Sequence, residues 1–154
     1  MKMSAGSVVL GVCLAAGALA ACDGDSSGEG LSKAEYVERG DAICRRLETE
    51  GESVAVPPQE APLEAHVAFV EDVLALMHPA RDDFEALAAP EGDTAAKERF
   101  DGYWERVTST LERARDAAAG GERQEYEDAI AALQEDESLA EDFRDYGFEV
   151  CGNT

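Results

Sequence analysis

Residues 93–121 read DTAAKERFDGYWERVTSTLERARDAAAGG, and this stretch decides the fold class. Its larger apolar and alanine side chains recur at steps of four, three, four, three and four residues, at Phe100, Trp104, Val107, Leu111, Ala114 and Ala118. This spacing keeps one face of an α-helix apolar and is the seam along which antiparallel helices pack. Asp93 or Thr94 can cap the start of the helix, and Gly120-Gly121 ends it. The stretch therefore predicts one long amphipathic helix.

The segment before it follows the same rule. Its stripe consists of Leu63, Val67, Val70, Leu74 and Met77, and the register continues through Arg81, Phe84 and Ala88. Pro62 suits a helix start, and the helix is expected to end before Pro90-Glu91-Gly92. Pro79 interrupts the hydrogen-bond ladder, so we expect a kink or a short break near residues 77–79.

Two further helices are predicted at the ends of the domain. The first spans about residues 32–50, where Ser32 and Glu35 form a capping box. A loop follows at residues 51–62 because Pro57-Pro58 cannot continue a helix. The fourth helix runs from about Glu122 to residues 147–150, with inward-facing Tyr126, Ile130, Leu133, Ala140 and Phe143. Residues 31–154 are therefore expected to form an all-α domain, an antiparallel four-helix bundle of up-down-up-down topology.

The first 22 residues indicate export. Residues 8–19, VVLGVCLAAGAL, form an uncharged apolar run that is too short to span a membrane comfortably. Leu19-Ala20-Ala21-Cys22 then resembles a bacterial lipobox, whose cysteine receives diacylglycerol and becomes the mature N-terminus. The alternative is an ordinary cleavage site with Cys22 there by chance. We predict a signal peptide at residues 1–21, and lipidated Cys22 with a flexible acidic linker at residues 22–30. The domain would then be anchored by acyl chains such as palmitate to the extracytoplasmic face of the cell membrane.

The cysteine inventory follows from this prediction. Of the four cysteines, Cys13 lies in the removed segment and Cys22 carries the lipid. Cys44 and Cys151 remain, and in an oxidising compartment two remaining thiols most simply form one disulfide.

The charge and the motif content argue against nucleic-acid binding, metal binding and catalysis. The chain has 13 Lys and Arg against 34 Asp and Glu, a formal charge of −21, and so no nucleic-acid partner is expected. The only histidines, His66 and His78, are twelve positions apart, about 120° around a helix. Neither has an acid three residues earlier, so the di-iron pattern of helical bundles is absent. We predict no catalytic residue, no metal site and no cofactor, and expect function to survive loss of both histidines.

Two segments resemble a known group of proteins. Residues 31–37, LSKAEYV, with residues 41–44, DAIC, are similar to the start of small exported lipoproteins of high-GC Gram-positive bacteria. Residues 146–152, YGFEVCG, are similar to the end of the same proteins. The resemblance implies an envelope location and a Cys44–Cys151 pair, and it implies no activity.

The sequence supports three hypotheses of function. The first is a non-enzymatic binding or interaction module of the cell envelope, held to the membrane through Cys22, with an unknown protein or small-molecule ligand. The second is an acidic bundle that sequesters cations or metals through carboxylates on its helix faces. An enzyme is the third and least favoured, because the apolar seams offer few polar residues.

Overall fold

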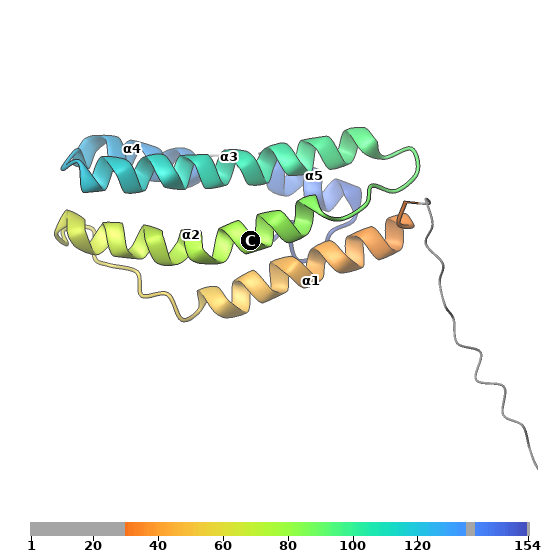
Figure 1. The fold of residues 1–154 in the computed structure, drawn as a ribbon, viewed down its shortest axis with the longest axis horizontal. Coiled ribbons are helices and arrows are strands. Elements are labelled where there is room, and N and C mark those ends of the chain that lie inside the picture. The colour runs from red at the N-terminus through yellow and green to blue at the C-terminus, as the bar shows by residue number, and fades with distance from the viewer. Residues whose placement is uncertain (1–29, 135–137, 154) are drawn as a thin grey trace, which may run out of the picture.

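The computed structural model describes residues 30–134 and 138–153, and these ranges contain five α-helices and no strand (Figure 1). The helices are α1 (Lys33–Gly51), α2 (Leu63–Glu85), α3 (Thr94–Ala119), α4 (Arg123–Gln134) and α5 (Ser138–Tyr146). The all-helical prediction is confirmed for this part of the chain. The predicted signal peptide, the lipidated Cys22 and the linker up to residue 29 lie outside the described residues.

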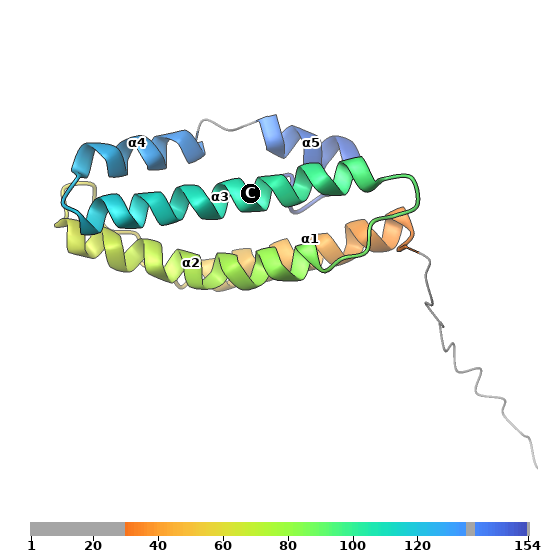
Figure 2. The same ribbon diagram turned by 45° about the horizontal axis from the view of Figure 1, so that its top comes forward.

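The helices run alongside one another in an elongated domain. Successive helices from α1 to α4 alternate in direction, and α4 and α5 follow each other along α3 (Figures 1 and 2). The long helices α2 and α3 pack together, α4 packs on α3, and α1 packs on α2. Because α1 covers only the C-terminal half of α2, the loop after α1 runs along the other half (Figure 1). We call this loop, residues 52–62, the strap.

The expected single fourth helix is instead two helices, α4 and α5. The apolar stripe of the sequence is weakest between the last residue of α4 and the first residue of α5. Leu133 and Ala140 are seven residues apart, and the residues between them include Glu135-Asp136-Glu137, which supply no apolar side chain to the seam. Amphipathic helices are held mainly by burial of their apolar face, so this is where the pattern least supports a continuous helix.

The start of α1 agrees with its local sequence signal, and the start of α3 does so only in position. The Ser32 hydroxyl accepts a hydrogen bond from the Glu35 N–H at 3.3 Å, and the Glu35 carboxylate accepts from the Ser32 N–H at 3.0 Å. The predicted capping box is therefore confirmed. Asp93 precedes α3 but makes no side-chain cap, because its carboxylate accepts from the Tyr146 hydroxyl at 2.7 Å.

Pro79 does not break α2, which continues to Glu85. Proline lacks the N–H that would bond the carbonyl of Ala75. Both Pro79 and Ala75 are exposed, so water can reach the unpaired carbonyl and the interruption is tolerated. Of the two outcomes expected from the sequence, the short break is thus excluded.

Aromatic side chains fill the core where α1, α2, α3 and α5 meet. The rings of eight aromatic residues pack there in one cluster, formed by Tyr36, Phe84, Phe100, Tyr103, Trp104, Phe143, Tyr146 and Phe148. Phe84 is fully buried at its centre.

Two predicted seam positions are wrong. Arg81 is only partly buried and pairs with Asp82, and Ala88 is exposed beyond the end of α2.

Candidate ligand-binding site

The C-terminal segment is joined covalently to α1. Cys44 and Cys151 form a disulfide with a Cα–Cα distance of 5.3 Å, across 107 positions of sequence. Gly147 makes this possible with a φ of +117°, a conformation that favours glycine. The chain turns there, and the Phe148 N–H donates to the Phe143 carbonyl at 2.9 Å. The predicted pairing is confirmed.

Asp41 fixes the same segment without a covalent bond. Its carboxylate is 7% exposed and accepts hydrogen bonds from the N–H groups of Glu149 and Val150, each at 2.9 Å, and of Cys151 at 3.1 Å. A buried carboxylate is stable only with such partners. Sequence reasoning did not single out Asp41. The available signal was its position three residues before Cys44, on the same face of α1.

Gly40 lets the C-terminal segment come this close. A Cβ atom at Gly40 would lie 2.5 Å from the Phe148 ring and 3.0 Å from the Phe84 ring. The Arg144 guanidinium adds a hydrogen bond to the Gly152 carbonyl at 2.8 Å. Gly40, Asp41 and Cys44 together form a docking face on α1, and its role is to hold the fold.

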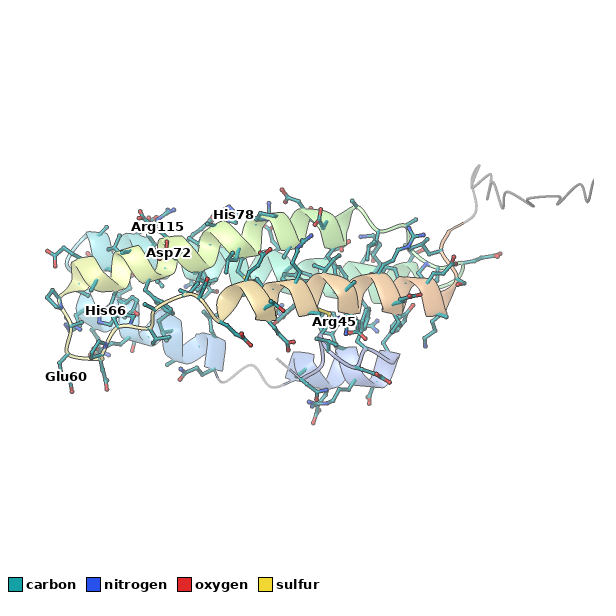
Figure 3. All side chains as sticks on the ribbon, turned by 90° about the horizontal axis from the view of Figure 1, so that it is seen from below. Arg45, Glu60, His66, Asp72, His78 and Arg115 are labelled. Carbon is teal, nitrogen blue, oxygen red and sulfur yellow. A yellow bond between two sulfur atoms is a disulfide. The ribbon has the colours of Figure 1, made fainter. Side chains whose placement is uncertain are left out.

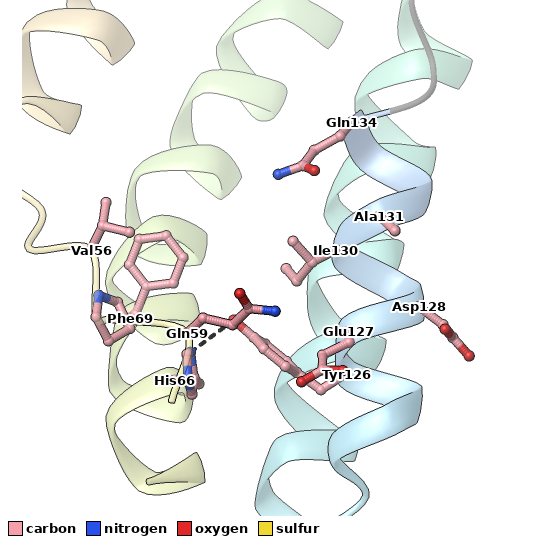
Figure 4. Close-up of a pocket in the computed structure, with 11 residues that line it drawn as sticks. Val56, Gln59, His66, Phe69, Tyr126, Glu127, Asp128, Ile130, Ala131 and Gln134 are labelled. Carbon is pink, nitrogen blue, oxygen red and sulfur yellow. Dashed lines mark hydrogen bonds between the residues drawn. The ribbon is translucent and has the colours of Figure 1, made fainter. Parts of the chain in front are cut away.

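A cavity lies at the other end of the domain, between the strap, α2 and α4. It measures about 620 Å³. Its apolar lining comprises Val56, Pro57, Phe69, Ile130 and Ala131, and its polar lining comprises Gln59, His66, Tyr126, Glu127, Asp128 and Gln134. Figure 4 shows His66 and Phe69 on α2 across from Tyr126 and Ile130 on α4, with Val56 and Gln59 coming from the strap.

His66 and Tyr126 form a hydrogen-bonded pair in this cavity. His66 is 4% exposed, and its Nδ1 lies 3.1 Å from the Tyr126 hydroxyl (Figure 4). Burial raises the pKa of Tyr126 above its ordinary value, so the phenol keeps its proton at neutral pH. His66 Nε2 is buried and has no hydrogen-bond partner among the described residues. Buried polar atoms without a partner are uncommon in folded proteins. The described residues contain three others, the Tyr36 hydroxyl, His78 Nε2 and Trp104 Nε1, and of the four only the His66 atom belongs to a residue that lines this cavity.

Arg123 holds the strap against α4. Its guanidinium donates to the carbonyl of Gln59 at 3.2 Å and to that of Ala61 at 2.8 Å. The strap also carries Val56, which is 77% exposed, the one large hydrophobic side chain exposed among the described residues. The cavity wall on this side is therefore irregular backbone, whereas the other walls are helices.

The two histidines have different environments, as their predicted placement on different faces requires. His78 is farther along α2 than His66, and Figure 3 shows the two well separated. Its ring is 42% exposed, although its Nε2, like that of His66, is buried and lacks a hydrogen-bond partner among the described residues. This atom lies 3.3 Å from a Glu112 carboxylate oxygen, without hydrogen-bond geometry. Sequence reasoning treated the two as equivalent. The signal that separates them is spacing, because His66 follows Leu63 by three residues and precedes Val70 by four.

Carboxylates do not gather into a metal centre in the part of the chain that the structure describes. It holds no group of three or more His, Cys, Asp or Glu side chains arranged to hold a metal ion. None of the described helices is both long and apolar enough to cross a membrane. The chain matches no protein-family model, no curated protein and no solved structure.

Proposed function

We propose that this protein is a lipid-anchored, extracytoplasmic binding module of the cell envelope, and that the cavity between the strap, α2 and α4 holds a small ligand. The observation that carries the proposal is a cavity of ligand size whose lining includes His66, a residue whose Nε2 is buried beneath covering atoms and has no hydrogen-bond partner. Small-molecule sites are typically concave, mostly apolar and roughly 300–1,000 Å³ in volume, with a few polar groups that orient the ligand.

The lining of the cavity fits this description. Val56, Phe69 and Ile130 supply apolar surface, and the His66–Tyr126 pair supplies a fixed polar group. An unpaired buried N–H or nitrogen lone pair costs about 1–3 kcal/mol of stability. A ligand that satisfies it recovers that free energy on binding, which gives the site affinity and orientation without catalytic chemistry. This proposal replaces the expectation that function survives loss of His66, and it keeps that expectation for His78.

The envelope location rests on the sequence at Cys22 and on the resemblance to small exported lipoproteins. Two structural facts support it. A disulfide such as Cys44–Cys151 persists in oxidising compartments and is rare in the cytosol. The two segments that carry the resemblance also contact each other, because Asp41 and Cys44 bind the turn that ends at Cys151.

The cation-sequestering alternative has no comparable support. Aligned carboxylates would need to converge on one point, and acidic side chains such as Asp72 and Glu85 are instead exposed on the helix surfaces.

Replacing Cys22 by Ala is expected to abolish membrane association, because the acyl chains on this thiol are the proposed anchor. The variant should move from the detergent phase to the aqueous phase in detergent partitioning, and labelled fatty acid should no longer be incorporated. A Cys13→Ala variant is the matched control and should stay lipidated. Equal acylation of the Cys22→Ala protein and the wild type would contradict the proposed anchor.

Filling the cavity should abolish ligand retention. Ala131 and Ala132 are neighbouring exposed residues of α4, but Ala131 lines the cavity and Ala132 lines a separate hollow beside Tyr103. Protein purified from its own membranes should release a small molecule on denaturation, detectable by mass spectrometry. We expect that molecule to be missing from Ala131→Trp and present in Ala132→Trp. The same small molecules in all three samples would argue against the cavity as the binding site.

A further inference from the structure

The unpartnered atom of His66 is most simply an N–H donor. Tyr126 keeps its phenolic proton and can donate it to His66 Nδ1, so a neutral ring then carries its proton on Nε2. In the opposite arrangement Nδ1 donates to the Tyr126 oxygen. The phenolic proton and the Nε2 lone pair would then both lack partners. The first arrangement leaves one unsatisfied group and the second leaves two, so the first is favoured.

The charges around the cavity select against ionised ligands. Glu127 and Asp128 line it, and no Lys or Arg side chain does. The Arg123 guanidinium bonds to strap carbonyls and lies 3.8 Å from the Glu127 carboxylate. In a chain of net charge −21 an anion is repelled from such a rim. A cation is attracted to the rim, but its ammonium group offers no acceptor to an N–H donor at Nε2.

We propose that the cavity binds an uncharged, largely apolar small molecule that carries an oxygen acceptor, such as a carbonyl, for the N–H of His66 Nε2. The inference rests on the proposed binding function and names the chemical class of its ligand. Phe69 and Ile130 take the apolar body, and His66 fixes the position of the oxygen. Because Nε2 is shielded from solvent, an oxygen that reaches it displaces covering atoms and forms its hydrogen bond away from water.

A matched set of four probes with a common phenyl group tests this. Acetophenone carries a carbonyl acceptor, ethylbenzene carries none, benzoate is an anion and phenethylammonium is a cation. Binding is measured on the folded domain in the full chain, from methyl NMR shifts of Val56 and Ile130. We expect acetophenone to bind at least about tenfold more tightly than each of the other three, the value of one buried hydrogen bond.

Two variants test whether His66 causes the preference for acetophenone over ethylbenzene. His66→Phe should bind acetophenone and ethylbenzene equally, whereas His78→Gln, a change at the other histidine, should keep the wild-type preference. If His66→Phe does not fold, Tyr126→Phe is the second variant, since without the phenol nothing holds the proton on Nε2. The preference for acetophenone should then fall several-fold.

The outcomes separate the two proposals. Equal binding of acetophenone and ethylbenzene to the wild type would overturn the acceptor inference and leave the binding function standing. Tighter binding of benzoate or phenethylammonium than of acetophenone would overturn the inference that the cavity selects an uncharged ligand. If none of the four probes shifts the Val56 or Ile130 methyl signals, the cavity does not bind small molecules and the proposed function fails with the inference.

Discussion

Replacing Cys44 and Cys151 together by alanine will lower the free energy of unfolding by about 4.7 kcal/mol, the value that chain entropy assigns to a closed loop of about 100 residues. The disulfide closes 107 positions, nearly the whole described domain. Single domains have a free energy of unfolding of roughly 5–15 kcal/mol, so the loss is a large share of the total. The variant is expected to be marginally folded at best.

Urea denaturation, with and without a reducing agent, measures this effect. The reducing agent should destabilise the wild type to about the level of the double variant and should leave the variant unchanged, which serves as the control. A loss below about 1 kcal/mol would mean that the disulfide restricts the unfolded chain much less than the chain-entropy account requires.

Asp41→Asn is the second large effect, with an expected loss of about 2–4 kcal/mol. The carboxylate accepts three backbone hydrogen bonds through both oxygens. An amide offers one acceptor oxygen, and its NH₂ group would face an N–H donor. At least one N–H among Glu149, Val150 and Cys151 would then lose its partner.

Two measurements identify this mechanism. Asp72→Asn makes the same change of charge at an exposed site of α2 and should alter stability by less than about 0.5 kcal/mol. Amide hydrogen exchange of Val150 and Cys151 should accelerate in Asp41→Asn and stay unchanged in the control. Equal stability of the two variants would show that the Asp41 hydrogen bonds contribute nothing to stability.

Local patterns were sufficient for most of the helices. The capping box at Ser32 and Glu35, the stripe from Phe100 to Ala118 and the glycines after it depend only on near neighbours in sequence. Division of the last helix into α4 and α5 was missed because Tyr126, Ile130 and Leu133 continue a helical pattern up to the acidic run. The predicted apolar stripe of the second helix continues beyond Met77 to Arg81, although a charged side chain at that position favours the surface.

The candidate site depended on contacts between distant residues. His66 and Tyr126 are 60 positions apart. The helical periodicity of each segment does not specify which faces of the two helices pack against each other. Asp41 is one acid among 34, and only the C-terminal turn more than 100 positions later distinguishes it from a solvated carboxylate. The Cys44–Cys151 pair was the exception, because export reduces the choice of partners to one.

The state of the His66 ring is the most direct test of the site. A long-range ¹H–¹⁵N correlation spectrum of the His78→Gln protein, in which His66 is the only histidine, reports the proton on each ring nitrogen at neutral pH. The structure predicts a protonated Nε2 and a bare Nδ1 that accepts from Tyr126. A proton found on Nδ1, or on both nitrogens, would contradict the account of a cavity built around one unpartnered N–H donor.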